Sequence, residues 1–543
     1  MSLIDFIILG TLVTGFLVYG LIGKMDTDTE EDYFLAGRDL PWYRIGLSLF
    51  STNFSASALI GITGAAYLTG IAIYNYEWVG VFALIFFIFS LVKVLRRCGI
   101  FTIAEYISRR YDRRVMMLHS LFLTFLLIFI DMAAALYAGA LLITSIIPEL
   151  STSVVIIAIM LLTGVYSIFG GLAAVSKTDT PQSIVTICGA FLIAYFTYNH
   201  AGNMGDLIVR LPETSLSLIR PIDDRAVPWT GLLTGIPILC AYYWLTNQNM
   251  VQWVLSAKSE GDAQKGILFA GFLKILILFI IVMPGIFASV LFPGITQPDQ
   301  IYPLMMTQLL PAGALGVVMA GFVAALMSNT DSTLHAASTI ITMDFVRNAR
   351  PNASSKSLVN IGRFIVLIII IISALWAPNI ASFGSLFEYI QSILSYAVTP
   401  FVVVYLGGIF WRGASTTGAI ATIVIGLSSA LVIGLLNSFI AAIDIHYLHI
   451  PLPIALICCL SLYFISRLYP SATAPSPELL WENYANTSAL SADAPTSLSH
   501  QAIANQAITN REIISAEKPN RTTIIAWSLA LTALTLVIVF IFR

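Results

Sequence analysis

Apolar segments long enough to cross a bilayer recur along the whole chain, and this feature limits the possible folds more than any other. A membrane-spanning α-helix needs roughly 20 mostly apolar residues. Lipid offers no partner for free backbone N–H and C=O groups, so each segment must be helical. We therefore expect an all-α polytopic membrane protein with about fourteen transmembrane helices. The segments lie near residues 3–23, 43–66, 70–95, 115–146, 153–170, 181–199, 229–255, 266–292, 304–340, 362–378, 384–409, 416–437, 449–468 and 523–542.

The composition agrees with a chain that lies mostly in lipid. Hydrophobic residues make up 58% and charged residues 10%, against about 25% charged in soluble domains. The net charge of −2 predicts no nucleic-acid partner, and membrane lipid is the expected surrounding. The cysteines form no CxxC pair, so we expect neither a disulfide framework nor a zinc site. They are Cys98, Cys188, Cys240, Cys458 and Cys459.

Lys and Arg gather in alternate connections, and this bias predicts the orientation of the chain. The connections after the third and ninth segments are basic, whereas residues 145–152 and 291–302 hold no Lys or Arg. We expect the basic loops to face the cytoplasm and both termini to lie on the opposite side. Residues 199–228 are then external, although three arginines and three aspartates lie in them.

Polar residues crowd the middle of the second segment, at residues 48–58. Ser and Asn compete for backbone hydrogen bonds, and a helix interrupted in lipid is tolerated only where it lines a cavity or is buried in protein. In secondary transporters such breaks expose carbonyl groups that bind sodium beside a substrate site. The other interpretation is small residues that pack one helix against another.

Further polar groups interrupt other apolar segments. Side chains of this kind cost free energy in lipid, so the first expectation is that they have a function. Each one alone can instead form an interhelical hydrogen bond or ion pair. Together they must converge on a wet cavity or on one another. They are Glu77, Asp131, Lys274, Gln391, the amide cluster Asn247, Gln248, Asn249 and Gln252, and the polar residues 328–332.

The stretch from residue 470 to 521 differs from the rest, being rich in Ser, Ala, Asn, Thr and Pro without a periodic apolar face. We expect a flexible cytoplasmic linker, and the alternative is a small folded cap.

Several motifs, in order along the chain, resemble those of the sodium:solute symporter family. They are Glu-Glu-Asp-Tyr-Phe-Leu-Ala-Gly at 30–37, Gly-Gly-Leu-Ala-Ala-Val at 170–175 followed by Thr178, Asp179 and Gln182, the pair Gln248 and Gln252, Ala-Lys-Ser at 257–259, Ala-Gln-Lys-Gly at 263–266, and Gly-Gly-Ile-Phe-Trp at 407–411. The similarity runs from about residue 30 to 415 and is strongest to bacterial sodium/sugar cotransporters of the sodium–galactose type.

The resemblance implies a core of two inverted five-helix repeats, at residues 42–200 and 228–410, and a multi-pass protein of the bacterial inner membrane. Around this core we expect an N-terminal helix with a cytoplasmic loop (1–41), an external loop (201–227), two peripheral helices (411–469), the linker (470–521) and a C-terminal helix (522–543). It also implies a transporter rather than an enzyme, with sodium as its ion.

The resemblance also assigns residues to the ion. The sodium ligands are expected to be the backbone carbonyls of Ser51, Phe54 and Ala325 with the side chain of Ser328. Asn329 replaces a hydroxyl ligand of the sugar branch, and its amide oxygen still suits a hard cation. Asp179 matches a family carboxylate near the inner exit or a second sodium site, and we expect it to act in coupling.

A second set of residues is assigned to the substrate. Glu77, Lys274 and Gln391 match sugar-binding positions, Asn53 joins them, and Tyr243 matches a ring that stacks on the sugar as an inner gate. Two positions depart from the sugar branch, because Ala58 replaces a glutamine and Asp131 an asparagine. Asp131 and Lys274 are expected to pair, directly or through a sugar hydroxyl, or to read a charged substrate.

These features together predict a sodium-coupled symporter that imports a sugar by alternating access. Three alternatives remain: a symporter for sialic acid, inositol, an amino acid or a carboxylate; a channel, which would show repeated pore rings; and a membrane sensor or enzyme. An acidic substrate would favour an arginine-rich pocket, and no Arg lies in the middle of a predicted span. The sequence does not determine which sugar is transported, how many sodium ions accompany it or how many subunits the protein has.

Overall fold

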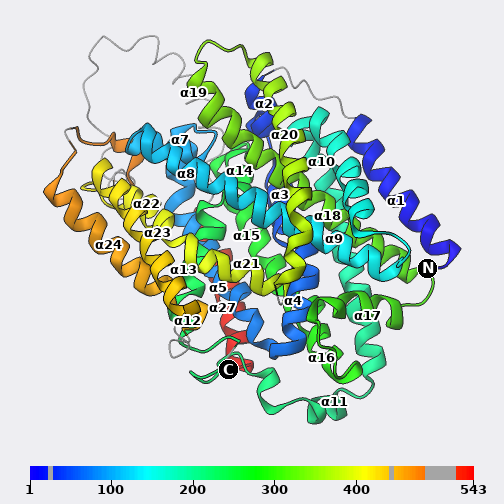
Figure 1. Cartoon of the computed structure of the whole chain (residues 1–543). Coiled ribbons are helices and arrows are strands. Elements are labelled where there is room, and N and C mark those ends of the chain that lie inside the picture. Colours follow the sequence, from blue (N-terminus) through cyan, green and yellow to red (C-terminus); the bar gives the residue numbers. More distant parts are fainter. Residues whose placement is uncertain (23–28, 225, 384, 440–444, 472, 483–520) are drawn as a thin grey trace.

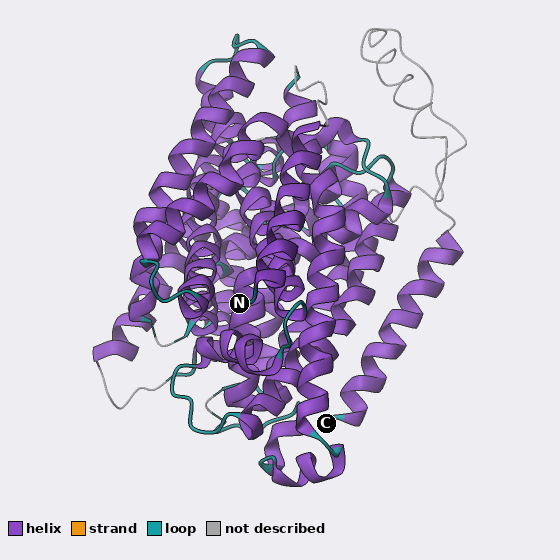
Figure 2. Ribbon diagram, turned by 90° about the vertical axis from the view of Figure 1, so that its right-hand side faces the viewer, coloured by secondary structure: helices purple, strands orange, loops and turns teal. Residues whose placement is uncertain are grey.

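The computed structural model describes residues 1–22, 29–224, 226–383, 385–439, 445–471, 473–482 and 521–543. Across these residues the chain is helical, apart from connections and two isolated β-bridges. Most of the helices run side by side along one common direction (Figure 2). The expected all-α, polytopic class is confirmed.

The first part of the chain builds eleven helices. They are α1 (Leu3–Ile22), α2 (Glu30–Leu35), α3 (Trp42–Asn53), α4 (Ala56–Thr69), α5 (Asn75–Phe86), α6 (Val92–Cys98), α7 (Ile103–Arg110), α8 (Arg113–Leu126), α9 (Ala133–Ile146), α10 (Thr152–Ala201) and α11 (Met204–Arg210).

The described remainder adds fourteen more. They are α12 (Gly231–Thr234), α13 (Ile236–Ala241), α14 (Gln248–Leu255), α15 (Glu260–Ile277), α16 (Met283–Leu291), α17 (Ile301–Leu309), α18 (Ala314–Thr339), α19 (Arg347–Ala349), α20 (Ser355–Trp376), α21 (Leu386–Ala397), α22 (Thr399–Phe410), α23 (Thr416–Phe439), α24 (Pro451–Leu468) and α27 (Arg521–Ile541). Turns of π-helix join several of them: η3 (Phe87–Leu91), η4 (Leu127–Met132), η6 (Tyr242–Thr246), η7 (Leu278–Val282) and η9 (Ile340–Val346).

Among the described residues, ten helical stretches are long and apolar enough to cross a membrane, and the pair α21–α22, bent by 54°, makes eleven. Two shorter apolar helices, Thr152–Leu161 and Gly231–Thr246, lie beside them. The stretch Ala56–Cys98 overlaps two predicted segments, 43–66 and 70–95. The number of crossings therefore depends on how interrupted helices are counted, and the expected total of about fourteen stays a prediction.

The polar stretch at residues 48–58 interrupts its helix, as predicted. α3 ends at Asn53, and Phe54 leaves the helical region with φ −82° and ψ 56°. Ser55 is extended and caps α4, because its hydroxyl accepts a hydrogen bond from the backbone N–H of Ala58 at 3.2 Å. The last carbonyl groups of α3 have no partner within the helix, so the break presents acceptors in the protein interior.

A second break lies in the segment that starts the other predicted repeat. After η6 the backbone of Asn247 is extended, with φ −74° and ψ 120°. Its side-chain oxygen accepts a hydrogen bond from the N–H of Asn249 at 3.0 Å and so caps α14. Both breaks thus lie where a Ser or an Asn caps the start of a new helix.

α10 carries two of the predicted segments and bends at Gly171, whose φ is +62°. A side chain at this position would be strained by the backbone and would meet the ring and the carbonyl of Tyr33 at 2.9 Å. Glycine therefore lets the short helix α2 lie directly against α10.

α18 lies at the centre of the helix bundle (Figure 1). It packs against α10, α1, α3, α9, α14 and α20. Nearly all of its residues are buried. Its polar residues 328–332 therefore face protein and not lipid. This position makes α18 the neighbour of both broken helices.

The last helix, α27, packs against α15 and α5. Gly271 of α15 leaves room for Leu531, which an added side-chain carbon would meet at 2.7 Å. Tyr106 of α7 donates a hydrogen bond to the carbonyl of Leu479 at 2.8 Å, so the segment around Leu479 packs on α7. Most of the predicted linker, residues 483–520, lies outside the described residues.

Candidate functional site

One internal cavity gathers the predicted substrate residues. Its volume is about 140 Å³, and its walls come from both sides of the α3–α4 break, α5, η4, η6, α14, α15, α18 and α21. All six residues assigned to the substrate line it: Asn53, Glu77, Asp131, Tyr243, Lys274 and Gln391. Residues more than 300 positions apart in the sequence thus meet in one place.

Lys274 and Glu77 form a buried ion pair at the edge of this cavity. Their side chains are 1% and 8% exposed. The Lys274 ammonium also donates a hydrogen bond to Oδ1 of Asn53 at 3.0 Å and lies 4.6 Å from the centre of the Trp244 ring. A buried charge requires such partners, and Asn53 can supply one because it ends α3 at the break.

The expected direct pair between Asp131 and Lys274 is wrong, because Lys274 pairs with Glu77. The amide of Asn247, at the second break, lies beside the carboxyl group of Asp131. The sequence places both charges in apolar segments, but it does not show which helices adjoin. The correct partner follows from the packing of α15 against α5.

Tyr243 lies in the π-helical turn η6, next to the cavity. Its ring meets Trp244 edge-on, with centroids 5.2 Å apart. A π-helical turn rotates the residues that follow it and is often found at functional sites. Asp131 lies in another such turn, η4, so two cavity residues owe their direction to a turn that the hydrophobic pattern does not reveal.

The predicted sodium residues meet beside the cavity, between the end of α3 and the middle of α18. The hydroxyl groups of Ser51 and Ser328 lie 2.5 Å apart, and Ser328 donates a hydrogen bond to Oδ1 of Asp179 at 2.6 Å. Oδ2 of Asp179 is buried without a hydrogen-bond partner. Three oxygen-bearing side chains from α3, α10 and α18 are therefore joined, and one carboxylate oxygen remains available.

The other residues assigned to sodium lie around this group. Phe54 is at the break itself, and Ala325 lies about one helical turn before Ser328 on α18. The amide nitrogen of Asn329 donates a hydrogen bond to the carbonyl of Thr52 at 3.0 Å. Asn329 also lines the substrate cavity, so in this structure it connects the two sites.

Other residues of the cavity wall were not assigned from the sequence, and two of them have a buried polar atom without a hydrogen-bond partner. Ser57 and Asn249 both line the cavity, and Oγ of Ser57 and Oδ1 of Asn249 are buried without a hydrogen-bond partner. Asn249 is held by a hydrogen bond from its amide nitrogen to Thr333 at 3.0 Å. Their place within the polar stretch 48–58 and the amide cluster was the available signal.

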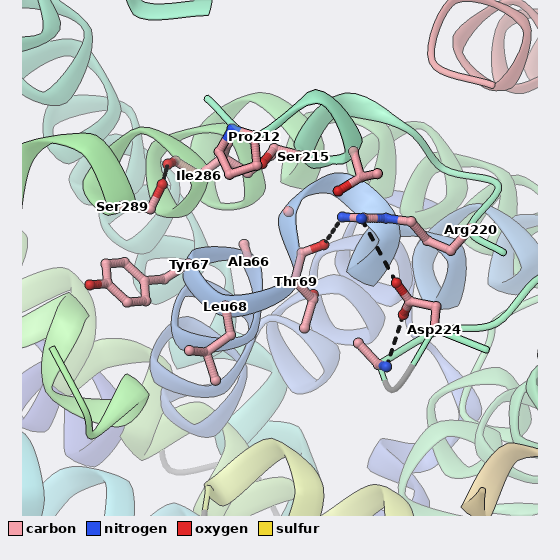
Figure 3. A pocket seen from close by; sticks show the side chains of 13 residues that line it. Ala66, Tyr67, Leu68, Thr69, Pro212, Ser215, Arg220, Asp224, Ile286 and Ser289 are labelled. Atoms are coloured by element: carbon pink, nitrogen blue, oxygen red, sulfur yellow. Dashed lines mark hydrogen bonds and ion pairs between the residues drawn. The ribbon is translucent and has the colours of Figure 1, made fainter. Parts of the chain in front are cut away.

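A second pocket, of about 260 Å³, lies where the loop between α10 and α12 meets the end of α4 (Figure 3). Arg220 reaches into it, donates a hydrogen bond to the carbonyl of Thr69 and faces the carboxylate of Asp224 at 3.8 Å. None of the predicted site residues lines this pocket. Its walls are mostly loop and helix ends, and its arginine holds the loop to α4.

The sequence of this chain is similar to those of known proteins. The model of the sodium:solute symporter family matches residues 33–426. The sodium/glucose cotransporter of Vibrio parahaemolyticus is 33% identical over 464 residues, which cover 79% of this chain and 85% of that protein. The sodium/myo-inositol cotransporter 2 of Homo sapiens is 34% identical over 471 residues, which cover 79% of this chain and 69% of that one.

A solved structure shares the fold. A sodium-coupled sialic acid symporter in a substrate-bound, outward-open state matches with a TM-score of 0.76 at 19% identity, over 87% of this chain and 100% of that one. The similar proteins named here are transporters and not enzymes. The matched residues 33–426 include all residues assigned above to the substrate and to the ion. By this match and by its relatives, the chain belongs to the sodium:solute symporter family.

Proposed function

We propose that the protein imports a small polyhydroxy solute, a sugar or an inositol, together with sodium by alternating access. Family membership makes sodium the coupling ion. The cotransporters of glucose and myo-inositol among its relatives support a polyol as the substrate. The chain thus acts as a secondary transporter in the membrane.

One observation carries this proposal: the substrate cavity and the ion residues share the same two structural elements. Asn53 lines the cavity while Ser51, two residues earlier, contacts Ser328. On α18, Ser328 contacts the ion residues and its neighbour Asn329 lines the cavity. An ion that fixes the end of α3 against α18 therefore also shapes the cavity, which is the physical requirement for coupling.

The cavity suits hydroxyl groups. It offers donors and acceptors in alternation, from the ammonium of Lys274 to the amide of Gln391, with the ring of Tyr243 beside them. A site built to pair hydroxyls also rejects ligands that lack them. Among the described residues, no Arg lines the cavity and the one lysine that does is neutralised by Glu77, so an acidic solute such as sialic acid or a carboxylate is disfavoured.

We assign the sodium ion to the backbone carbonyls of Ser51, Phe54 and Ala325 and the hydroxyl of Ser328. Oxygen ligands of this kind suit a hard cation, and carbonyls are free where α3 ends. Asp179 holds Ser328 by a hydrogen bond and acts in coupling. Asn329 reaches the same break through the carbonyl of Thr52.

The architecture that accompanies this function is two inverted repeats, at residues 42–200 and 228–410. The two breaks support it, since each interrupts the first segment of its repeat. On this view the loop 201–227 is external, the chain lies in the bacterial inner membrane, and the peripheral helices after residue 411 stand outside the core.

The driving force is sufficient for import. One sodium ion that crosses roughly 100 mV releases about 2.3 kcal/mol, and a tenfold sodium gradient adds about 1.4 kcal/mol. At one-to-one coupling the sum supports roughly 500-fold accumulation of the solute.

Uptake into proteoliposomes tests the proposal. A panel of radiolabelled hexoses, myo-inositol, sialic acid and amino acids is offered with and without an inward sodium gradient. We expect accumulation of one or more polyols only with the gradient, and its loss when an ionophore removes the gradient. Gradient-driven uptake confined to an acidic or non-hydroxylated solute would refute a polyol substrate.

A further inference from the structure

The described lining of the substrate cavity has one more carboxyl group than it has cationic groups. In the part of the chain that the structure describes, three ionisable side chains line the cavity: Glu77, Asp131 and Lys274. Lys274 and Glu77 neutralise each other as an ion pair. The side chain that lies beside Asp131 is the neutral amide of Asn247. If both carboxylates are ionised, the lining therefore has a formal charge of −1, located on Asp131.

The same cavity holds acceptor atoms without partners. Oδ1 of Asn249, which only accepts, is buried without a hydrogen-bond partner, as is Oγ of Ser57, which can accept or donate, and an ionised carboxylate accepts without donating. The one cationic donor, Lys274, is already engaged by Asn53 and Glu77. A hydroxyl both donates and accepts, whereas an ammonium group offers three donors and no acceptor. Oδ1 of Asn249 and the carboxylate of Asp131, which accept and do not donate, match the ammonium better.

The aromatic residues of the cavity fit a cation as well. Tyr243, Trp244, Tyr76 and Phe387 all line it. The faces of such rings attract a positive charge, and the effect is larger where water is excluded. The Lys274 ammonium already uses the Trp244 ring, and Tyr243 lies next to it.

We propose that the solute is an amino polyol, a sugar or inositol that carries a protonated amino group, and that Asp131 binds this group. The proposal rests on the proposed function and names the substrate class within it. Hydroxyl groups of the solute meet Lys274, Glu77 and Gln391, while the ammonium meets Asp131 and the free oxygen of Asn249. Asp131 is thus the residue that separates amino polyols from neutral ones.

Matched pairs of solutes test this idea without any variant. Each pair differs by one group: D-glucosamine and D-glucose, D-galactosamine and D-galactose, D-mannosamine and D-mannose, and an amino-inositol and myo-inositol. N-acetylated forms, in which the charge is removed, complete the set. Binding to the purified protein in sodium buffer and sodium-driven uptake into proteoliposomes are both measured.

We expect at least one amino member to bind roughly tenfold or more tightly than its hydroxyl partner, the factor that corresponds to about 1.4 kcal/mol. The N-acetyl form should lose this advantage. In Asp131→Asn the preference should disappear or reverse. The matched control is Asp206→Asn, which removes the same charge from the exposed helix α11 and should leave the ratio unchanged.

The outcomes separate this proposal from the proposed function. Sodium-driven uptake of neutral hexoses or myo-inositol, with no amino member preferred in the wild type, would overturn the role of Asp131 and leave the symporter intact. Absence of sodium-driven uptake for every polyol and amino polyol would refute the proposed function itself. If Asp131→Asn does not fold, Asn249→Leu, which removes the free acceptor, should reduce the amino preference instead.

Discussion

At the scale of single residues, Lys274 is held by groups that each meet one need of a buried cation. Glu77 supplies the opposite charge, Asn53 a hydrogen bond and Trp244 the face of a ring. Gly80 keeps the space free, since an added side-chain carbon there would lie 3.2 Å from Cε of Lys274. The ion pair is therefore part of the cavity wall.

This arrangement predicts the result of breaking the pair. Glu77→Gln leaves the ammonium of Lys274 buried without its counter-charge, and we expect a loss of stability of roughly 3–5 kcal/mol. The double variant Glu77→Gln with Lys274→Gln should be less destabilised than the sum of the two single changes. Thermal unfolding in detergent, arranged as a double-mutant cycle, measures the coupling.

An exposed pair provides the control for that cycle. Asp39 and Lys258 lie 3.8 Å apart with side chains 77% and 67% exposed. Asp39→Asn should change the stability by no more than about 0.5 kcal/mol. If the Glu77–Lys274 cycle gives a coupling as small as this, the pair does not hold the cavity.

At the scale of helices, α1 does more than anchor the chain. Asp5 is 1% exposed, and its carboxylate accepts hydrogen bonds from the backbone N–H groups of Gly313 and Gly316, at 2.8 and 2.9 Å. These groups lie at the start of α18, so a side chain of one helix caps the beginning of another. α1 thereby fixes the helix that carries Ser328 and Asn329.

Removal of this cap should loosen α18. Asp5→Ala is expected to cost about 0.5–2 kcal/mol, the range for lost helix caps, while Asp5→Asn should retain most of the stability. The melting temperature and the apparent sodium affinity are measured together. An alanine variant with unchanged values of both would show that α18 holds its position without α1.

The connection between α16 and α17 contains a group that makes stability depend on pH. Asp299 accepts a hydrogen bond from the N–H of Leu386 at 2.9 Å and so holds the start of α21. Burial raises the pKa of Asp299 from 3.8 to about 6. A raised pKa means that the folded state favours the protonated form of Asp299 more than the unfolded state does. Protonated Asp299 therefore contributes stability below about pH 4, and this contribution is lost as the pH rises through 6.

We therefore expect the difference in melting temperature between Asp299→Asn and the wild type to change between pH 4.5 and 7.5. The neutral variant should gain stability relative to the wild type as the pH rises, because it carries no buried charge. Unfolding curves at several pH values check this. A difference that is constant across the range would contradict the assigned pKa of Asp299.

The elements of the fold and of the site differ in how far the sequence predicts them. The break at Phe54 is predictable, because Ser and Asn are concentrated where an apolar helix is expected. The resemblance to the family assigns six residues to the substrate, and all six line the cavity. The partner of Lys274, the amide contact of Asn329 and the turns η4 and η6 are not predictable in this way, because they depend on which helices adjoin and on one extra residue in a helical turn.

At the scale of the whole molecule, the chain is apolar on the outside and polar at its centre. Large hydrophobic side chains are exposed along α1, α20, α23 and α27, while hydroxyl, amide and carboxyl groups are buried along α3, α10, α14 and α18. Lipid accounts for the first group, and the second requires a function because buried polar groups are costly. The substrate cavity and the ion residues lie within this polar centre, where α3 and α18 meet.

The central claim is that the contact between Ser51, Ser328 and Asp179 is the place where sodium drives solute uptake. The most direct test is the accumulation of a transported polyol in proteoliposomes as a function of external sodium, for the wild type and for Ser328→Ala. We predict that solute accumulation by the wild type saturates as the sodium concentration rises. Ser328→Ala should need a much higher sodium concentration or fail to accumulate solute, because the ion loses an oxygen ligand. Full-rate uptake by the wild type without sodium, driven by a proton gradient alone, or an unchanged sodium dependence in Ser328→Ala, would contradict the claim.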